Sequence, residues 1–344
     1  MKEKPKIIVT GGLGYIGSHC AVELISNGYS VVLVDDLSNS SKKVLYSLES
    51  ITNKNIEFEE IDLKNGELVK NLFLKHNNVS GLIHFAASKA VGQSVLNPLL
   101  YYQNNISSLV NVLNEIKNLK KGFNFIFSSS CTVYGQSKNL PVSEKDPIQK
   151  ATSPYGNTKQ ICEEIIEDFC KSNNRIKSIS LRYFNPIGAH KSSKIGELPK
   201  GNPNNLIPFI TQTGIGKQKE LSVFGNDYPT SDGTCIRDYI HVVDLAKAHV
   251  KALEILQNSF VKINYDVFNI GTGLGHSVFE VIKAFEKVSG IKLNYKICPR
   301  RSGDICEAYA NTEKANKILK WKAKHSLEEA ILSAWEWEKN INNL

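Results

Sequence analysis

The chain begins with short apolar runs that are separated by longer amphipathic stretches. The run "KIIVT" at 6–10 is β-branched and is followed by Gly-Gly. Strands that are buried on both faces of a parallel sheet have this composition. Further runs of this kind lie at 30–36, 55–62, 80–87 and 123–130.

The stretches between these runs have helical spacing. Residues 15–28 place apolar side chains three and four positions apart and end in Asn-Gly, a common helix stop. Strands that alternate with helices predict βαβ units. We therefore expect an α/β fold with a Rossmann-type, doubly wound parallel sheet, whose ligands bind at the carboxyl ends of the strands.

The alternation of strands and helices stops after residue 184. Residues 185–234 are rich in Gly, Asn and Pro and predict loops. We expect a first domain at 1–184 and a smaller C-terminal substrate-binding domain at 185–344, with part of 237–270 returning to the main sheet.

A glycine-rich turn links the first predicted strand to the first predicted helix. Gly11, Gly14 and Gly17 have the spacing G-x-x-G-x-x-G. The first glycine permits a tight turn, the second lets the backbone approach a pyrophosphate, and the third allows the helix to pack closely on the sheet. The free N–H groups at the start of the helix then face the phosphates.

An aspartate closes the second predicted strand. Asp35 lies about twenty residues beyond the glycine turn, at the spacing of a dinucleotide-binding unit. A carboxylate there accepts hydrogen bonds from the adenosine ribose and repels a 2′-phosphate, so it favours NAD over NADP. A simple turn aspartate is the alternative. The combined pattern predicts NAD as the cofactor.

Composition and charge exclude several other classes of protein. The 344 residues are 41% hydrophobic, and the net charge of +8 is scattered, which argues against a nucleic-acid partner. Seven cysteines without a C-x-x-C pair indicate a reduced, intracellular chain. The histidines form no H-x-x-x-H pair, so we expect no metal. No stretch approaches about 18 apolar residues, so we expect no membrane segment and a cytoplasmic location.

The candidate chemistry lies in a serine triplet and a Tyr-x-x-x-Lys motif. Residues 128–130 are serines at the end of the fifth predicted strand, and Tyr155 and Lys159 follow Ser153-Pro154 at a helix start. An exposed pair is the alternative, because i,i+4 neighbours touch on any helix. A tyrosine base near pH 7 needs a pKa about three units below its usual value of about 10, roughly 4 kcal/mol, and a cation supplies part of this. With the serines at the same edge, the motif predicts a general base for alcohol oxidation.

Several longer motifs extend over nearly the whole chain. They are "HFAASKAVGQSV" (84–95), "FSSSCTVYG" (127–135), "SPYGNTK" (153–159), "RYFNPIGAH" (182–190), "NPNNLIPFI" (202–210), "VFGNDYPTSDGT" (223–234), "RDYIHVVDLA" (237–246) and "PRRSGD" (299–304). With these motifs the sequence resembles the extended short-chain dehydrogenase/reductase superfamily and, within it, the UDP-glucose 4-epimerase (UDP-galactose 4-epimerase) family.

The resemblance implies a reversible epimerisation at C4 of UDP-hexoses through a transient 4-keto sugar and tightly bound NAD. Tyr155 would be the general base, Ser130 would hydrogen-bond the sugar 4-oxygen, and Lys159 would bind the nicotinamide ribose. Matched to the family, the NAD contacts beyond the glycines are Tyr15, Ile16, Asp35, Asn39, Ser40, Asp62, Leu63, Phe85, Ala86, Lys89, Asn104, Tyr155, Lys159 and Phe184.

The resemblance also implies a set of UDP-sugar contacts. Arg237 and Arg301 would clamp the diphosphate, because planar guanidiniums suit bidentate phosphate binding. For Arg237 the alternative is an ion pair with its neighbour Asp238. The full set is Ser130, Thr132, Tyr155, Asn185, Asn204, Asn205, Leu206, Val223, Phe224, Arg237, Arg301, Asp304 and Ala308.

One position departs from the bacterial-type pattern of the family. Ala308 stands where many members have a tyrosine, and a small residue here leaves room for an N-acetyl group at C2 of the sugar. We therefore expect UDP-N-acetylglucosamine and UDP-N-acetylgalactosamine to be substrates as well as UDP-glucose and UDP-galactose.

Three other functions fit parts of the pattern. A 4,6-dehydratase needs an Asp-Glu pair just after the strand-end serine, where this chain has Cys131 and Thr132. A nucleotide-sugar decarboxylase is disfavoured by the motifs of the second half. A non-catalytic NAD sensor would usually lack the tyrosine or the lysine. The resemblance further implies a homodimer formed through helices near 98–118 and 155–172.

Overall fold

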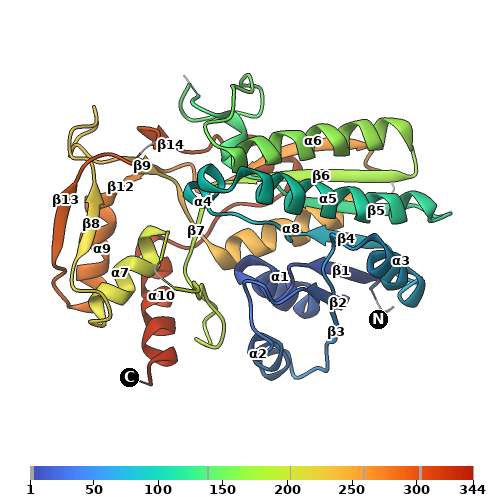
Figure 1. Cartoon of the computed structure of the whole chain (residues 1–344), viewed down its shortest axis with the longest axis horizontal. Coiled ribbons are helices and arrows are strands. Elements are labelled where there is room, and N and C mark those ends of the chain that lie inside the picture. The colour runs from blue at the N-terminus through green and yellow to red at the C-terminus, as the bar shows by residue number, and fades with distance from the viewer. Residues whose placement is uncertain (1–3, 138, 202, 259, 302–303, 344) are drawn as a thin grey trace.

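A seven-stranded parallel sheet forms the centre of the larger part of the molecule (Figure 1). The computed structural model describes residues 4–137, 139–201, 203–258, 260–301 and 304–343, so positions 202, 302 and 303 of two motifs lie outside the described residues. The strands, in their order across the sheet, are β11 (Tyr265–Ile270), β6 (Ile176–Tyr183), β5 (Phe123–Ser128), β4 (Gly81–His84), β1 (Lys6–Thr10), β2 (Ser30–Asp35) and β3 (Glu57–Glu60).

Helices cover both faces of this sheet. One face carries α1 (Tyr15–Ser26), α2 (Lys43–Thr52) and α8 (Val242–Gln257); the other carries α3 (Gly66–Lys75), α5 (Pro98–Asn118) and α6 (Pro154–Ser172). In β1, Ile7 and Val9 belong to the first core and Ile8 to the second. Burial on both faces explains why the strand has no polar alternation. The predicted doubly wound parallel sheet is confirmed.

The predicted strands and helices of the first half are found at or close to their expected bounds. β1 and α5 have the predicted limits, whereas β3 and β4 are shorter than the runs at 55–62 and 80–87. The remaining elements of this half are α4 (Val91–Leu96) and a 3-10 turn, η1 (Cys131–Tyr134).

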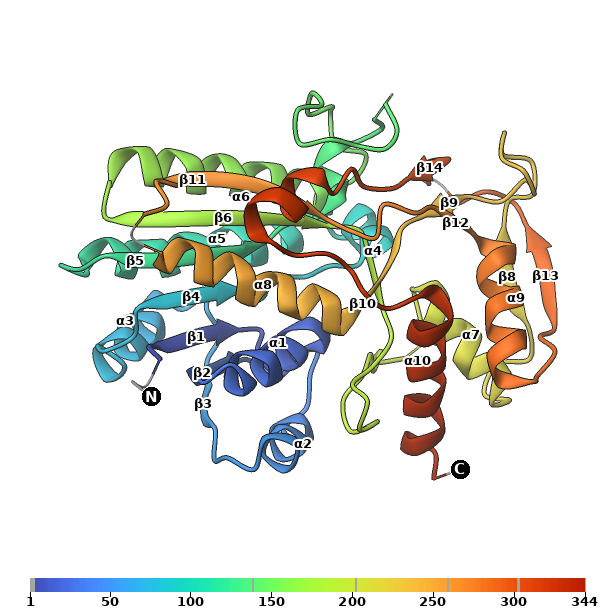
Figure 2. The same ribbon diagram turned by 180° about the vertical axis from the view of Figure 1, so that it is seen from behind.

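A second, smaller part lies beside the carboxyl edge of the sheet (Figures 1 and 2). It packs three helices and several short strands around its own core. Its elements are β7 (Asn185–Ile187), α7 (Leu206–Gly214), β8 (Leu221–Phe224), β9 (Ile236–Arg237), β10 (Tyr239–His241), β12 (His276–Ser277), α9 (Val278–Ser289), β13 (Tyr295–Cys298), β14 (Glu307–Ala308) and α10 (Leu327–Ile341). A π-helical turn, η2 (Ala315–Leu319), precedes α10.

Helix α7 was not expected, because the stretch at 185–234 predicts loops. Its first turn contains Pro208, which a helix tolerates there since the N–H groups of the first turn have no partner within the helix.

The two halves of the sequence are interleaved in the larger part. β11 pairs with β6 over Tyr265–Ile270 and Ser178–Tyr183, and α8 packs on α1 (Figure 2). Within the described ranges, no helix is long and apolar enough to cross a membrane. The expected cytoplasmic location stays a prediction.

Candidate active site

The glycine turn between β1 and α1 is shaped by close backbone contacts. Gly11 has φ +64°, and a Cβ there would lie 2.9 Å from the backbone nitrogen of Ala86. A Cβ on Gly17 would lie 2.2 Å from the carbonyl oxygen of Gly11. Gly14 forms the N-cap of α1 and brings no side chain to the N–H groups of the first turn. These features leave a bare helix start that fits the pyrophosphate of a dinucleotide.

Asp35 organises the loop beside this turn. Its carboxylate accepts hydrogen bonds from the backbone N–H groups of Leu13 (3.0 Å) and Leu37 (3.0 Å) and from the hydroxyl of Ser40 (2.6 Å). One aspartate thus ties the glycine turn to the loop that carries Asn39 and Ser40. A ribose hydroxyl would meet this carboxylate at the end of β2, and a 2′-phosphate would be repelled.

The other matched NAD residues lie along the same edge of the sheet. Asp62 and Leu63 follow β3, Phe85, Ala86 and Lys89 follow β4, and Asn104 is on α5. Asn104 donates to Ser88 Oγ (3.1 Å), and Lys89 lies 5.8 Å from the ring centroid of Tyr15. Tyr15 and Ile16 are the first residues of α1, and Phe184 follows β6.

Ser130, Tyr155 and Lys159 meet at the carboxyl end of β5. Tyr155 is in the first turn of α6, which Ser153 caps by accepting a hydrogen bond from Gly156 N (3.1 Å). The Lys159 ammonium donates to the carbonyl of Ser128 (2.7 Å) and lies 5.9 Å from the Tyr155 ring centroid. Tyr155 and Lys159 are 7% and 3% exposed, so the surface-pair alternative is excluded.

Ser130 also organises the turn that follows β5. Its side chain accepts hydrogen bonds from the backbone N–H (3.2 Å) and the hydroxyl (3.0 Å) of Thr132. The two hydroxyls therefore lie side by side in η1, as their assignment to one sugar-binding site requires.

Burial dominates the electrostatics of the tyrosine and the lysine. Burial raises the pKa of Tyr155, and the Tyr183 phenol adds to this, while a hydrogen bond with Ser130 opposes it. Burial lowers the pKa of Lys159 to about 8. In the protein alone the pKa of Tyr155 is therefore raised, whereas a base near neutral pH needs a lowered one.

Tyr183 is a site residue that the sequence patterns did not single out. It ends β6, and its hydroxyl lies 2.7 Å from Ser128 Oγ, directly beside the Lys159 anchor. Its position at the carboxyl end of a buried strand is the signal that could have identified it.

The predicted diphosphate clamps converge on Asp304. Arg301 Nε donates to Asp304 (2.9 Å), and Arg237 lies 3.9 Å from the same carboxylate. The Arg301 guanidinium also lies 5.0 Å from the ring centroid of Phe224.

The alternative pairing of Arg237 with Asp238 does not occur, because Asp238 faces a different set of donors. Its buried carboxylate accepts from the backbone N–H groups of Thr272, Gly273 and Ala310. Arg237 instead donates to the carbonyls of Ile236 (2.8 Å), Ile305 (2.7 Å) and Cys306 (3.2 Å).

Strand β8 carries two residues of the predicted UDP-sugar set, Val223 and Phe224. Leu221 and Val223 are buried in the smaller core, whereas Ser222 and Phe224 are half-buried on the opposite face. Successive side chains of a strand point to opposite faces. The Val223 side chain therefore faces away from Phe224, and Ser222 shares the face of Phe224.

Ala308, which is matched to the sugar pocket, lies on β14. Ala308 is 5% exposed and packs in a small cluster with Phe184, Val133 and Val142. It pairs with Arg237 in the register of β14 and β9. The matched NAD contact Phe184 and the matched sugar contact Ala308 are therefore close neighbours.

The predicted asparagines and Leu206 lie around the start of the smaller part. Asn185 begins β7, and Asn204, Asn205 and Leu206 lead into α7. The amide of Asn205 donates to Glu197 (2.7 Å), which also pairs with Lys89 (3.2 Å). Glu197 thus links a matched substrate residue to a matched NAD residue.

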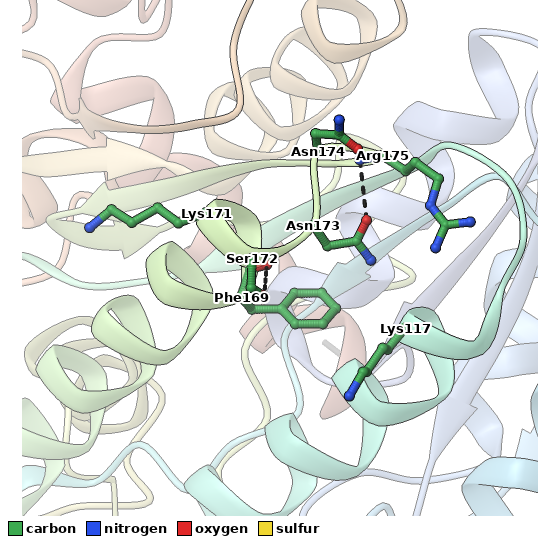
Figure 3. A pocket seen from close by; sticks show the side chains of 7 residues that line it. All are labelled: Lys117, Phe169, Lys171, Ser172, Asn173, Asn174 and Arg175. Atoms are coloured by element: carbon green, nitrogen blue, oxygen red, sulfur yellow. Dashed lines mark hydrogen bonds between the residues drawn. The ribbon is translucent and has the colours of Figure 1, made fainter.

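A separate hollow of about 580 Å³ lies at the other edge of the sheet, where α5 and α6 end (Figure 3). Figure 3 shows the side chain of Lys171 pointing away from Lys117 and Arg175. None of the predicted site residues lines this hollow.

The fold and the site together define an extended short-chain dehydrogenase/reductase. The defining features are the glycine turn between β1 and α1 and the buried Ser130, Tyr155 and Lys159. The chain matches the family model described as GDP-mannose 4,6 dehydratase over residues 8–333. It is 49% identical to the UDP-glucose 4-epimerase of Bacillus subtilis, with 98% of each chain covered.

Solved structures give the same result. The UDP-glucose 4-epimerase of Bifidobacterium longum, in complex with NAD+ and UDP, matches with a TM-score of 0.93 at 44% identity over 98% of this chain and 99% of that one. The UDP-Glc/GlcNAc 4-epimerase of Campylobacter jejuni matches with a TM-score of 0.83 at 36% identity over 98% and 100%. The chain belongs to the UDP-glucose 4-epimerase family.

Proposed function

We propose that this chain interconverts UDP-galactose and UDP-glucose, and also UDP-N-acetylgalactosamine and UDP-N-acetylglucosamine, with NAD that stays bound. The observation that carries the proposal is the buried convergence of Ser130, Tyr155 and Lys159 at the strand end next to the glycine turn. When bound, NAD supplies a hydride acceptor for C4 of the sugar and a positive charge on its nicotinamide ring.

The side chains of the protein handle the proton and hold the sugar. Tyr155 takes the proton of the sugar 4-hydroxyl. It returns the proton after the 4-keto sugar has rotated in the site and presents its other face. Ser130 and Thr132 hydrogen-bond the 4-oxygen. The Lys159 ammonium, fixed by the Ser128 carbonyl, favours the phenolate while it is protonated. Ser130 acts in the same direction, because its hydrogen bond lowers the pKa of Tyr155 that burial raises.

The nucleotide is held by the smaller part of the molecule. Arg237 and Arg301 bind the diphosphate in place of their present contact with Asp304, which is then free for the uridine ribose. Residues 1–184 with the returning strand β11 bind NAD, and the rest of 185–344 mainly binds the UDP-sugar.

The dehydratase alternative lacks its acid–base pair. Burial raises the pKa of the Cys131 thiol to about 11, so this side chain stays protonated at neutral pH. Thr132 carries no titratable group in this range.

A two-substrate assay tests the proposed function. Purified protein without added cofactor should convert both UDP-galactose and UDP-N-acetylgalactosamine, with the products resolved by chromatography. Turnover of UDP-galactose alone would remove the N-acetyl substrates from the proposal. If neither sugar reacted after NAD was supplied, the epimerase assignment would be wrong.

We further propose a homodimer formed through α5 and α6. Apolar side chains are exposed along α4 and the start of α5: Val95 (61%), Leu96 (80%), Leu99 (80%) and Leu100 (48%). A second copy would remove this surface from water. Sedimentation equilibrium should give twice the chain mass of 38.3 kDa, and Leu99→Glu should lower it. A concentration-independent monomer would contradict the dimer.

A further inference from the structure

Three successive turns of α6 are attached to the three serines that end β5. Tyr155 contacts Ser130, Lys159 donates to the Ser128 carbonyl (2.7 Å), and the Ser129 hydroxyl donates to Glu163 (2.5 Å). The spacing of four residues along α6 places all three side chains on the helix face that lies against the sheet. Two of these contacts belong to the mechanism above, and the third has no role in it.

Glu163 is also the partner of a buried arginine. Arg182, next to Tyr183 at the end of β6, donates to both carboxylate oxygens of Glu163, with Nε–Oε1 at 3.0 Å and NH2–Oε2 at 2.5 Å. Glu163 and Arg182 are 7% and 6% exposed. A buried ion pair of this kind contributes little net stability, because both charges lose their hydration. Its position suggests a role in geometry instead.

Glu163, through Ser129 and Arg182, joins the three segments that carry the proposed catalytic residues and their neighbours. Glu163 is on the helix of Tyr155 and Lys159, Ser129 lies between the end of β5 and Ser130, and Arg182 is on β6. We propose that Glu163 is a positioning residue for the epimerase reaction: its tether to Ser129 and Arg182 fixes α6, and with it Tyr155 and Lys159, on the ends of β5 and β6. This proposal rests on the proposed function.

Glu163 also acts on Lys159 through its charge. Glu163 and Cys162 raise the pKa of Lys159, which burial lowers to about 8. The titratable groups that face Tyr155 and Lys159 from the surrounding elements are His84 on β4, Tyr101 on α5, Cys131 after β5, Tyr183 on β6, and Cys162 and Glu163 on α6. Burial and the Lys159 ammonium lower the pKa of His84 to about 3, and the charge that faces Glu163 itself is Arg182 on β6.

Two variants separate the charge from the tether. Glu163→Gln keeps the size of the side chain and removes its charge, so the pKa of Lys159 falls and the ammonium is lost at a lower pH. The alkaline limb of the kcat profile with UDP-galactose should move about one pH unit lower. Ser129→Ala keeps every charge and removes the hydrogen bond that ties Glu163 to the end of β5, so the limb stays in place. In both variants kcat should fall at least about 10-fold at nearly constant KM, because a small misplacement of the base is costly.

Glu338→Gln is the matched control. Glu338 is a buried carboxylate too, 4% exposed, and pairs with Lys217 (3.2 Å) in the smaller part. Thermal unfolding should show a loss of stability similar to that of Glu163→Gln, with wild-type kcat and an unshifted pH profile.

The outcomes decide between a positioning role and a merely structural one. An unshifted alkaline limb in Glu163→Gln, or loss of activity only in proportion to unfolded protein, would overturn the charge role. Wild-type kcat in Ser129→Ala would overturn the positioning of α6 through Ser129, and this variant decides the matter if Glu163→Gln does not fold. Wild-type protein that is inactive on UDP-galactose would instead overturn the proposed function.

Discussion

Tyr155→Phe should lose epimerase activity by about 10³-fold or more while the protein stays folded and keeps its NAD. Phe has the same shape as Tyr without the hydroxyl that moves the proton, and general acid–base catalysis contributes about 10²- to 10⁴-fold. Because Tyr155 is 7% exposed and packs in the first turn of α6, the ring itself should stay in place. The measurement is turnover of UDP-galactose, together with the NAD released from the denatured protein.

Tyr102→Phe provides the control for this substitution. Tyr102 lies on α5, and its hydroxyl accepts a hydrogen bond from Asn157 on α6 (2.7 Å), so the variant removes a phenol hydroxyl near the site without removing the proposed base. It should retain most of the activity. Normal turnover by Tyr155→Phe would show that another group moves the proton.

Ala308→Tyr should abolish turnover of UDP-N-acetylgalactosamine and largely spare UDP-galactose. Ala308 is 5% exposed and lies beside Arg237 and Phe184, where a phenol ring fills space that an acetamido group would need. Overpacking of a tight site costs about 1–3 kcal/mol, or about 10- to 200-fold in rate. The expected result is a selective fall in kcat/KM for the N-acetyl sugar by at least about 10-fold.

A small substitution at the same position gives the comparison. Ala308→Ser should turn over both sugars nearly as well as the wild type, because it adds a single oxygen. If Ala308→Tyr reduced both activities equally, the residue would act on the fold of β14 rather than on substrate choice.

Residues that lie at strand ends could be predicted from sequence, because apolar runs mark the strands and a parallel sheet brings their carboxyl ends to one edge. The run at 6–10, the glycine turn and Asp35 lie where the pattern places them, and β5 brings the serines to the edge. The position of Tyr183 beside Ser128 could not be predicted from sequence, because it depends on the pairing of β6 with β5, a contact between distant segments.

Other features depend on the environment that the fold creates. The position of Val223 could not be assigned because the face of a short strand is set by its packing, which buries Val223 with Leu221. The raised pKa of Tyr155 results mainly from its burial, and a sequence shows the neighbouring lysine but not the loss of water.

The return of the chain to the main sheet has a consequence for its synthesis. β6 is made before residues 185–264, and its partner β11 follows only after them. On the ribosome, the nascent NAD-binding half therefore emerges with β6 as an unpaired edge strand. Helix α1 at this stage lacks α8, the helix that packs against it in the complete fold. The larger part is completed only when most of the chain has been translated, so a product released early, before β11, would present an unpaired strand to other chains in the cell.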